Sequence, residues 1–236
     1  MNPWLRRSSR DPKTGRGLEP HGGDWATWQL ERRGITDQEV LRAMRAVPRE
    51  RFVPSDMAHL AYQDGALPIG HGQTISQPYI VALMTDALAL PAWRAAHGGE
   101  APKVLDVGTG SGYQAAVLAE MGADVVSVEL EPELAEHAGQ TLADLGYSVR
   151  VVVGDGSAGA PDEASFAGIL IAAAAPDVPA PLVEQLLPDG RLVVPIGNRL
   201  EQVITLVRRT EDGFTREPIE PAVFVPLLGA YGFDDR

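Results

Sequence analysis

A regular alternation of apolar runs and amphipathic segments from Lys103 onward constrains the fold of this chain most strongly. The strand-like runs are KVLDVG, ADVVSVEL, VRVVVGD, FAGILIAAA, RLVVPIG and QVITLVRR, and helical segments such as YQAAVLAEMG, PELAEHAGQTLADLG and APLVEQLL separate most of them. Such alternation predicts an α/β fold with a mainly parallel sheet, helices on both faces and right-handed crossovers. No helical segment interrupts the runs from Phe214 to Leu228, so we expect antiparallel strands at one edge.

The region before the sheet divides into a tail and a helical part. Residues 1–33 begin with a stretch rich in Pro, Gly, Ser and Arg, and we expect a flexible tail there. Residues 34–236 are then a single domain, with a helical and loop part over 34–100 and the sheet over 101–236. Thr36 and Glu39 have the spacing of a capping box at the start of one helix. Pro78 suits the first turn of a second helix, which puts Ser76 at or beside its N-cap.

Composition excludes several classes of protein. The 236 residues carry a formal net charge of -12, which disfavours binding to nucleic acid or to an anionic membrane surface. The chain has no cysteine, which excludes disulfides and thiolate chemistry and fits a reducing compartment. No window approaches the apolar length of a membrane span, and the histidines have no metal-ligand spacing. We therefore expect a cytoplasmic protein without a metal site. A monomer is expected as well, although nothing in the composition determines the oligomeric state.

Three points at the carboxyl ends of predicted strands indicate a ligand pocket. A glycine-rich turn, VLDVGTGSGY, lies between a strand and a helix, where missing side chains let the backbone approach a ligand. Glu129 ends the next strand and can accept hydrogen bonds from both hydroxyls of a ribose. Asp155 follows the third strand between two glycines, where it could reach an adenine amino group. Each has a plainer alternative, namely tight packing, a solvated acid and a turn-forming aspartate.

These three features together describe a pocket for an adenosine-bearing ligand without phosphates, and S-adenosylmethionine is the candidate. The glycine spacing lacks the last glycine of the dinucleotide fingerprint, which disfavours NAD and FAD. Asp106 is expected to support the methionyl amino group, directly or through water, unless it is only a buried structural acid. The residues predicted to bind this cofactor are Asp106, Gly108, Thr109, Gly110, Gly112, Glu129, Asp155 and Gly156.

The chain resembles the protein-L-isoaspartate O-methyltransferase family, in particular its bacterial members. The resemblance rests on VPRERFVP, LAYQDGALPIGHGQTIS, VLDVGTGSGY, VGDGS and FVPLLG, which occur in this order between Thr36 and Gly229. It implies a Rossmann-like S-adenosylmethionine-dependent methyltransferase fold. It also implies methylation of the free α-carboxylate of L-isoaspartyl residues in damaged proteins and peptides, with S-adenosyl-L-homocysteine as product and a succinimide on the repair path.

The resemblance also identifies Ser76 as the active-site residue. This agrees with its position, because the N-terminus of a helix favours an anion and the reacting group of the substrate is a carboxylate. A serine that only caps the helix is the alternative. The residues expected on the substrate side are Ile69, Gly70, Thr74, Ile75, Val225 and Pro226. Two departures from the family pattern are Gln77-Pro78-Tyr79 after Ser76, and Ala172 where the family often has threonine.

Two other functions use the same pocket. One is carboxyl methylation of ordinary aspartate in a single dedicated peptide partner. The other is a cofactor-binding module without catalytic activity, against which the presence of Ser76, Gly110 and Glu129 argues.

Overall fold

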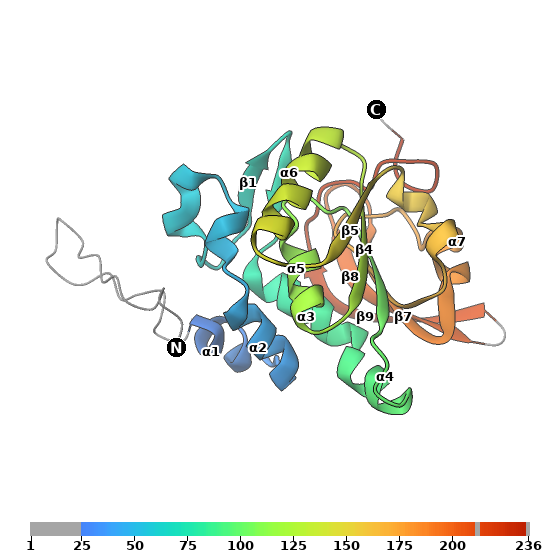
Figure 1. The fold of residues 1–236 in the computed structure, drawn as a ribbon. Coiled ribbons are helices and arrows are strands. Elements are labelled where there is room, and N and C mark those ends of the chain that lie inside the picture. The colour runs from blue at the N-terminus through green and yellow to red at the C-terminus, as the bar shows by residue number, and fades with distance from the viewer. Residues whose placement is uncertain (1–24, 211–212, 235–236) are drawn as a thin grey trace, which may run out of the picture.

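A seven-stranded sheet forms the centre of the molecule, in the computed structural model that describes residues 25–210 and 213–234 (Figure 1). Its strands are β3 (Lys103–Val107), β4 (Asp124–Glu129), β5 (Val149–Val153), β6 (Phe166–Ile171), β7 (Leu186–Gly197), β8 (Gln202–Thr210) and β9 (Gly213–Ala222). Their order is β5-β4-β3-β6-β7-β8-β9, with the first five parallel and the last two joined antiparallel. The predicted parallel sheet with antiparallel C-terminal edge strands is confirmed.

Helices cover the two faces of the sheet unequally. The helices are α1 (Trp25–Gln29), α2 (Gln38–Ala46), α3 (Pro78–Leu88), α4 (Leu90–Ala96), α5 (Tyr113–Glu120), α6 (Pro132–Asp144) and α7 (Ala180–Glu184). Buried side chains of α2, α3 and α5 form one core with one face of the sheet, and α7 packs into a second core on the other face. Figure 1 shows α5 and α6 on one side of the strands and α7 on the other. Alternate strand residues supply the two cores, as a pleated strand requires.

The boundary between tail and domain is a correction to the sequence analysis. Residues 25–33 were expected in a flexible tail, but they form α1 and a short 3-10 turn, Glu31–Arg33. Ala26 and Leu30 are fully buried in the larger core. The polar composition of the neighbouring residues hid this helix, whose burial depends on contacts with later segments. Residues 1–24 lie outside the part of the chain that the structure describes.

The two helix starts of the N-terminal part were predicted with different success. Asp37, not Thr36, caps α2, because its carboxylate accepts the N–H groups of Glu39 and Val40 at 2.8 and 3.1 Å. Helix α3 begins at Pro78 with Gln77 as N-cap, so Ser76 lies beside the N-cap, as predicted.

A small hairpin precedes α3 and was not predicted. Its strands β1 (Leu67–Gly70) and β2 (Gln73–Ile75) pair antiparallel outside the main sheet. His71 and Gly72 form the tight turn with positive φ angles of 51° and 70°. The hairpin delivers the chain directly to Ser76 and α3.

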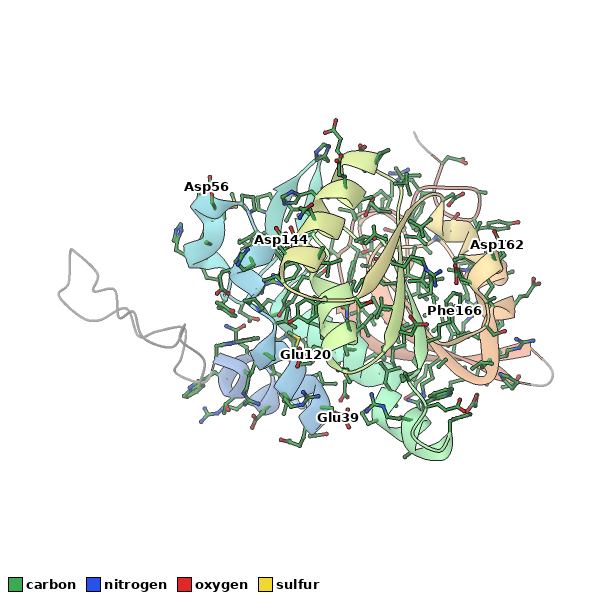
Figure 2. All side chains as sticks on the ribbon, viewed as in Figure 1. Glu39, Asp56, Glu120, Asp144, Asp162 and Phe166 are labelled. Atoms are coloured by element: carbon green, nitrogen blue, oxygen red, sulfur yellow. The ribbon has the colours of Figure 1, made fainter. Side chains whose placement is uncertain are left out.

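The acidic character of the chain is carried largely at the surface. Figure 2 shows Asp56 and Asp162 at the outer edge of the molecule, whereas Phe166 lies inside against the sheet. Phe166 is fully buried. Among the described helices, none is long and apolar enough to cross a membrane.

Candidate active site

A cleft opens where the strand order of the sheet reverses. The connections from β3 and β6 leave toward opposite faces of the sheet, and such a switch point is where α/β proteins bind ligands. Gly108 and Ala172 follow these two strands, and a Cβ at Gly108 would lie 3.8 Å from Ala172. The cleft has a volume of about 940 Å³, including the part open to solvent. It is lined by residues 73–76, 107–111, 128–130, 172–173 and 224–228, with Val81, Met84, Tyr113, Gln114 and Gly156.

The glycine-rich turn forms one wall of the cleft. Gly108, Gly110 and Gly112 have φ angles of 88°, 53° and 89°, which residues with side chains rarely adopt. Gly108, Thr109 and Gly110 line the cleft as predicted, while a Cβ at Gly112 would lie 3.2 Å from Leu142. Gly112 therefore allows α5 and α6 to pack closely. For this glycine the structure supports tight packing, the alternative to ligand contact.

Glu129 lies at the end of β4 beside this turn. Its Oε2 accepts a hydrogen bond from the N–H of Gly110 at 2.8 Å, and its Oε1 accepts from the N–H of Glu131 at 3.1 Å. The side chain lines the cleft and is only 8% exposed. Two backbone donors thus fix a carboxylate whose remaining acceptor capacity faces the cleft, as hydroxyl recognition requires.

Asp106 lies behind the turn rather than on the surface of the cleft. It is fully buried, and its Oδ2 accepts a hydrogen bond from the Ser127 hydroxyl at 2.7 Å, which in turn is 2.6 Å from the Thr109 hydroxyl. Its Oδ1 is buried without a partner among the described residues. Burial raises the pKa of Asp106 to about 7, although the bond from Ser127 opposes the shift. An unpaired buried oxygen here is suited to a donor that the chain does not supply.

Asp155 turns away from the cleft and holds the C-terminal segment. Its Oδ1 accepts from the N–H and hydroxyl of Ser157 at 2.9 and 2.6 Å, and its Oδ2 accepts from the N–H of Ala230 at 2.8 Å. Partial burial would raise the pKa of Asp155, but these hydrogen bonds outweigh it and hold the pKa below its usual value. The neighbouring Gly156 does line the cleft. A Cβ at Gly156 would lie 2.6 Å from Val107, so only glycine fits there.

The opposite wall comes from two segments that are far apart in the sequence. Thr74, Ile75 and Ser76 end the hairpin, and Val225 and Pro226 belong to the segment after β9. The N–H of Ala174 donates to the carbonyl of Val225 at 2.8 Å and the N–H of Leu227 donates to the carbonyl of Ala174 at 2.7 Å, which anchors this segment beside β6. Thr74, Ser76 and Val225 also border an adjoining hollow of about 610 Å³.

The remaining predicted substrate residues differ in position. Ile69 lies against the glycine turn, since its Cδ1 would be 3.4 Å from a Cβ at Gly110. Gly70 lies at the end of β1 with a φ of 91°, and it is not among the residues that line the cleft. Gly70 therefore serves the turn of the hairpin.

Ser76 lines both the cleft and the adjoining hollow, directly before the N-cap of α3. Its carbonyl accepts a hydrogen bond from Nη2 of Arg49 at 2.7 Å. The serine thus combines a hydroxyl in the cleft with a helix N-terminus, and both favour an anion.

Several residues of the cleft were missed by the sequence analysis. Gln114 on α5 donates to the Thr85 hydroxyl at 2.9 Å and closes the floor, and Met84 and Phe224 add apolar surface. Leu130 directly follows Glu129 and could have been found from that position. The others carry no local signal, because only packing brings their elements to the cleft.

Comparisons with known proteins agree with this geometry. The sequence model of the family described as protein-L-isoaspartate(D-aspartate) O-methyltransferase matches residues 25–232. A protein-L-isoaspartate O-methyltransferase of Gloeobacter violaceus is 52% identical over 201 residues, which cover 84% of this chain and 94% of the relative. One of Hyperthermus butylicus is 48% identical over 219 residues, which cover 87% and 88%.

Solved structures give the same result. A protein-L-isoaspartate O-methyltransferase structure has a TM-score of 0.76 at 27% identity, covering 90% of this chain and 67% of that one. A Plasmodium falciparum structure described as a beta-aspartate methyltransferase in complex with S-adenosyl-L-homocysteine has a TM-score of 0.73 at 24% identity, covering 87% and 97%. This second likeness concerns the fold alone. The family model and the curated relatives match most of this sequence, and the sheet topology and the cleft are consistent with these matches. The chain belongs to the protein-L-isoaspartate(D-aspartate) O-methyltransferase family.

Proposed function

We propose that this protein transfers the methyl group of S-adenosylmethionine to the free α-carboxylate of L-isoaspartyl residues in damaged proteins and peptides. A carboxylate oxygen attacks the methyl carbon while its bond to sulfur breaks, which yields a methyl ester and S-adenosyl-L-homocysteine. The ester then closes to a succinimide, whose hydrolysis restores part of the aspartate. The observation that carries this proposal is the position of Ser76, at a helix N-terminus across the cleft from the glycine turn and Glu129.

The residues of the glycine-turn wall fit the cofactor. Gly108 and Gly110 leave backbone exposed to the cleft, and Glu129 offers acceptors for ribose hydroxyls. The unpaired Oδ1 of Asp106 is suited to the methionyl amino group, directly or through water. Gly156 would border the adenine, whereas Asp155 could add a contact only while sharing its oxygens with Ser157 and Ala230. When bound, S-adenosylmethionine supplies an electrophilic methyl group on a sulfonium.

The substrate wall needs to bind and orient a carboxylate, not to activate it. A carboxylic acid with a reference pKa of about 4 is ionised at neutral pH, so attack requires no general base. Ser76 and the N-terminus of α3 would hold the carboxylate in line with the methyl group, and water leaves as the cleft fills. Thr74, Ile75, Val225 and Pro226 would contact the peptide largely through backbone, which suits an enzyme that accepts many sequences.

The expectations about partners and location are part of this proposal. Isoaspartyl-containing proteins are the partners, and neither nucleic acid nor a membrane takes part. The protein acts as a monomer in the cytoplasm. Its net charge of -12 supports the statement about nucleic acid and membranes, and its lack of cysteine supports the location.

The test is methyl transfer from labelled S-adenosylmethionine to two synthetic peptides that differ only in L-isoaspartate or L-aspartate. Labelling of the isoaspartyl peptide alone is the expected result. Labelling of the aspartyl peptide alone would overturn the repair activity. Labelling of neither, with cofactor binding measured separately, would favour a dedicated partner or a silent cofactor-binding module.

A further inference from the structure

An arginine lies buried directly behind Ser76. Arg49 begins the short helix η3 (Arg49–Phe52), and its side chain is fully buried. Its Nη2 donates to the carbonyl of Ser76 at 2.7 Å, and its Nε donates to the carbonyl of Ala61 at 2.7 Å. One guanidinium therefore joins the segment after η4 (Ser55–Leu60) to the residue that precedes α3. Because Arg49 bonds the main chain of Ser76, it restrains where the serine stands in the cleft.

The positive charge of Arg49 has no counterion among the residues that the structure describes. The guanidinium forms no ion pair with a carboxylate of the described residues, and its Nη1 is buried without a hydrogen-bond partner. Its carbon lies 4.8 Å from the ring centre of Tyr113, which lines the cleft. Burial raises the pKa of Tyr113 to about 12, so the phenol is neutral at neutral pH. Arginine stays charged in nearly every protein environment.

Such a charge is costly unless something compensates for it. Removing an ion from water without a paired counterion costs several kcal/mol even after the protein relaxes. The cleft itself has no basic side chain among its lining residues, and its one acid is Glu129. Among the protein's own groups, the α3 N-terminus and Arg49 behind it are therefore the ones that can favour an anionic substrate beside Ser76.

We infer that Arg49 is a positioning residue of the active site, which fixes the backbone of Ser76 and supplies the positive charge that attracts the substrate carboxylate. Arg49 does not touch the reacting atoms. It acts through its hydrogen bond to the Ser76 carbonyl and through its electrostatic field, which reaches the cleft past the ring of Tyr113. The inference rests on the proposed function, because it assigns the charge to a carboxylate substrate.

The experiment compares Arg49→Lys and Arg49→Met in the full chain with the wild-type protein. Lysine keeps a charge but cannot bridge both carbonyls, and methionine keeps apolar volume without charge. Kinetics with an isoaspartyl peptide are measured at about pH 6, because burial lowers the pKa of the introduced lysine and a lower pH favours its charged form. We expect Arg49→Met to raise the peptide KM about tenfold, an effect typical of losing one nearby charge. We expect Arg49→Lys to have a peptide KM close to that of the wild-type protein but a lower kcat.

Arg94→Lys is the matched control. Arg94 also donates to a backbone carbonyl, that of Met121, and forms an ion pair with Glu39 at 2.9 Å, but it does not line the cleft. It should leave the peptide KM unchanged. The dissociation constant of S-adenosyl-L-homocysteine, measured for each variant, reports whether the fold and the cofactor wall are intact.

A double-mutant cycle tests whether Arg49 acts through Ser76. In a Ser76→Ala background, Arg49→Lys should lower kcat no further, since the hydroxyl that it positions is gone. Full additivity, an unchanged peptide KM in Arg49→Met, or an equal loss of cofactor affinity would each overturn the inference. If Arg49→Met does not fold, Arg49→Lys and the double-mutant cycle still test the inference. A wild-type protein without isoaspartyl activity would instead refute the proposed function, and the inference would fall with it.

Discussion

The two walls of the cleft are built in different ways. The glycine-turn wall comes from continuous strand-turn-helix segments, in which residues 107–111 and 128–130 lie at the carboxyl ends of β3 and β4 and directly after them. The Ser76 wall combines a hairpin near the start of the chain with residues 224–228 near its end. The first wall is fixed by backbone hydrogen bonds from Gly108 and Thr109 to the carbonyl of Val128. The second depends on side chains such as Arg49 and on isolated contacts with Ala174.

This contrast suggests a division of labour between the walls. A wall made of main-chain turns at strand ends is suited to one invariant ligand, the cofactor. A wall made from separate segments can adjust to peptides of different sequence and can lose its geometry through remote changes. Substitutions in the two walls should therefore affect different measured quantities.

The largest effect is expected at Glu129. Glu129→Ala removes two ribose acceptors and leaves the N–H groups of Gly110 and Glu131 without partners. Losing charge-assisted bonds worth about 4 kcal/mol should weaken S-adenosylmethionine binding roughly a thousandfold. Calorimetric titration measures the dissociation constant of S-adenosylmethionine, with Glu129→Gln as the isosteric control. Normal cofactor affinity in Glu129→Ala would contradict the division between the walls.

Asp106 should make stability depend on pH without changing substrate recognition. Its pKa is about 7 in the folded state against the ordinary value of 3.8, so between these two pH values the native protein holds a proton that the unfolded chain releases. Its stabilising contribution is present at low pH and is lost as pH rises from about 4 to about 7, by about 4 kcal/mol at 1.4 kcal/mol per unit. Asp106→Asn should gain in Tm relative to wild type as pH rises. Parallel Tm profiles without cofactor would refute this.

Ser76 tests the other wall. Ser76→Ala should lower kcat about a hundredfold, by about 3 kcal/mol, because the substrate carboxylate loses the group that aligns it. Cofactor affinity should change little, since the serine comes from a different segment of the cleft lining than the glycine turn and Glu129. Equal losses of cofactor affinity in Ser76→Ala, Glu129→Ala and Asp155→Ala would remove the distinction between the walls.

Asp155 joins the turn after β5 to the C-terminal segment. Asp155→Ala leaves the N–H groups of Ser157 and Ala230 without their acceptor and should free the segment that carries Leu227 and Leu228. Loosening by about 1–2 kcal/mol should speed amide exchange at Ala230 and Tyr231 and weaken cofactor binding about tenfold. Weaker cofactor binding with unchanged exchange would mean that Asp155 acts on the adenine alone.

The smallest effect is expected at the tip of the hairpin. His71 Nε2 lies 3.5 Å from Oε2 of Glu133 on α6, and both side chains are exposed. Such surface pairs contribute about 0–1 kcal/mol, so His71→Gln should lower the free energy of unfolding by at most about 1 kcal/mol and should change the peptide KM by less than about twofold. A larger rise in peptide KM would show that the hairpin tip contacts the substrate.

Sequence periodicity was sufficient for the architecture. The apolar runs after Lys103 predicted the parallel sheet, and the glycine turn, Glu129 and Gly156 could be placed near the cleft because each lies at or shortly after the end of a strand. Residues at the carboxyl ends of parallel strands lie at the same edge of the sheet, however the other elements pack. Local sequence therefore determined the glycine-turn wall and the N-terminal position of Ser76 relative to α3.

Tertiary structure alone decided the features that depend on contacts between distant segments. The burial of Ala26 and Leu30, the turning of Asp155 toward Ala230, and the guanidinium of Arg49 behind Ser76 have no local signal. A side chain's partner is set by whichever segment packs against it, and periodicity reports only which face is buried, not what covers it. For that reason the sequence identified the serine, and only the folded chain revealed the charge that lies behind it.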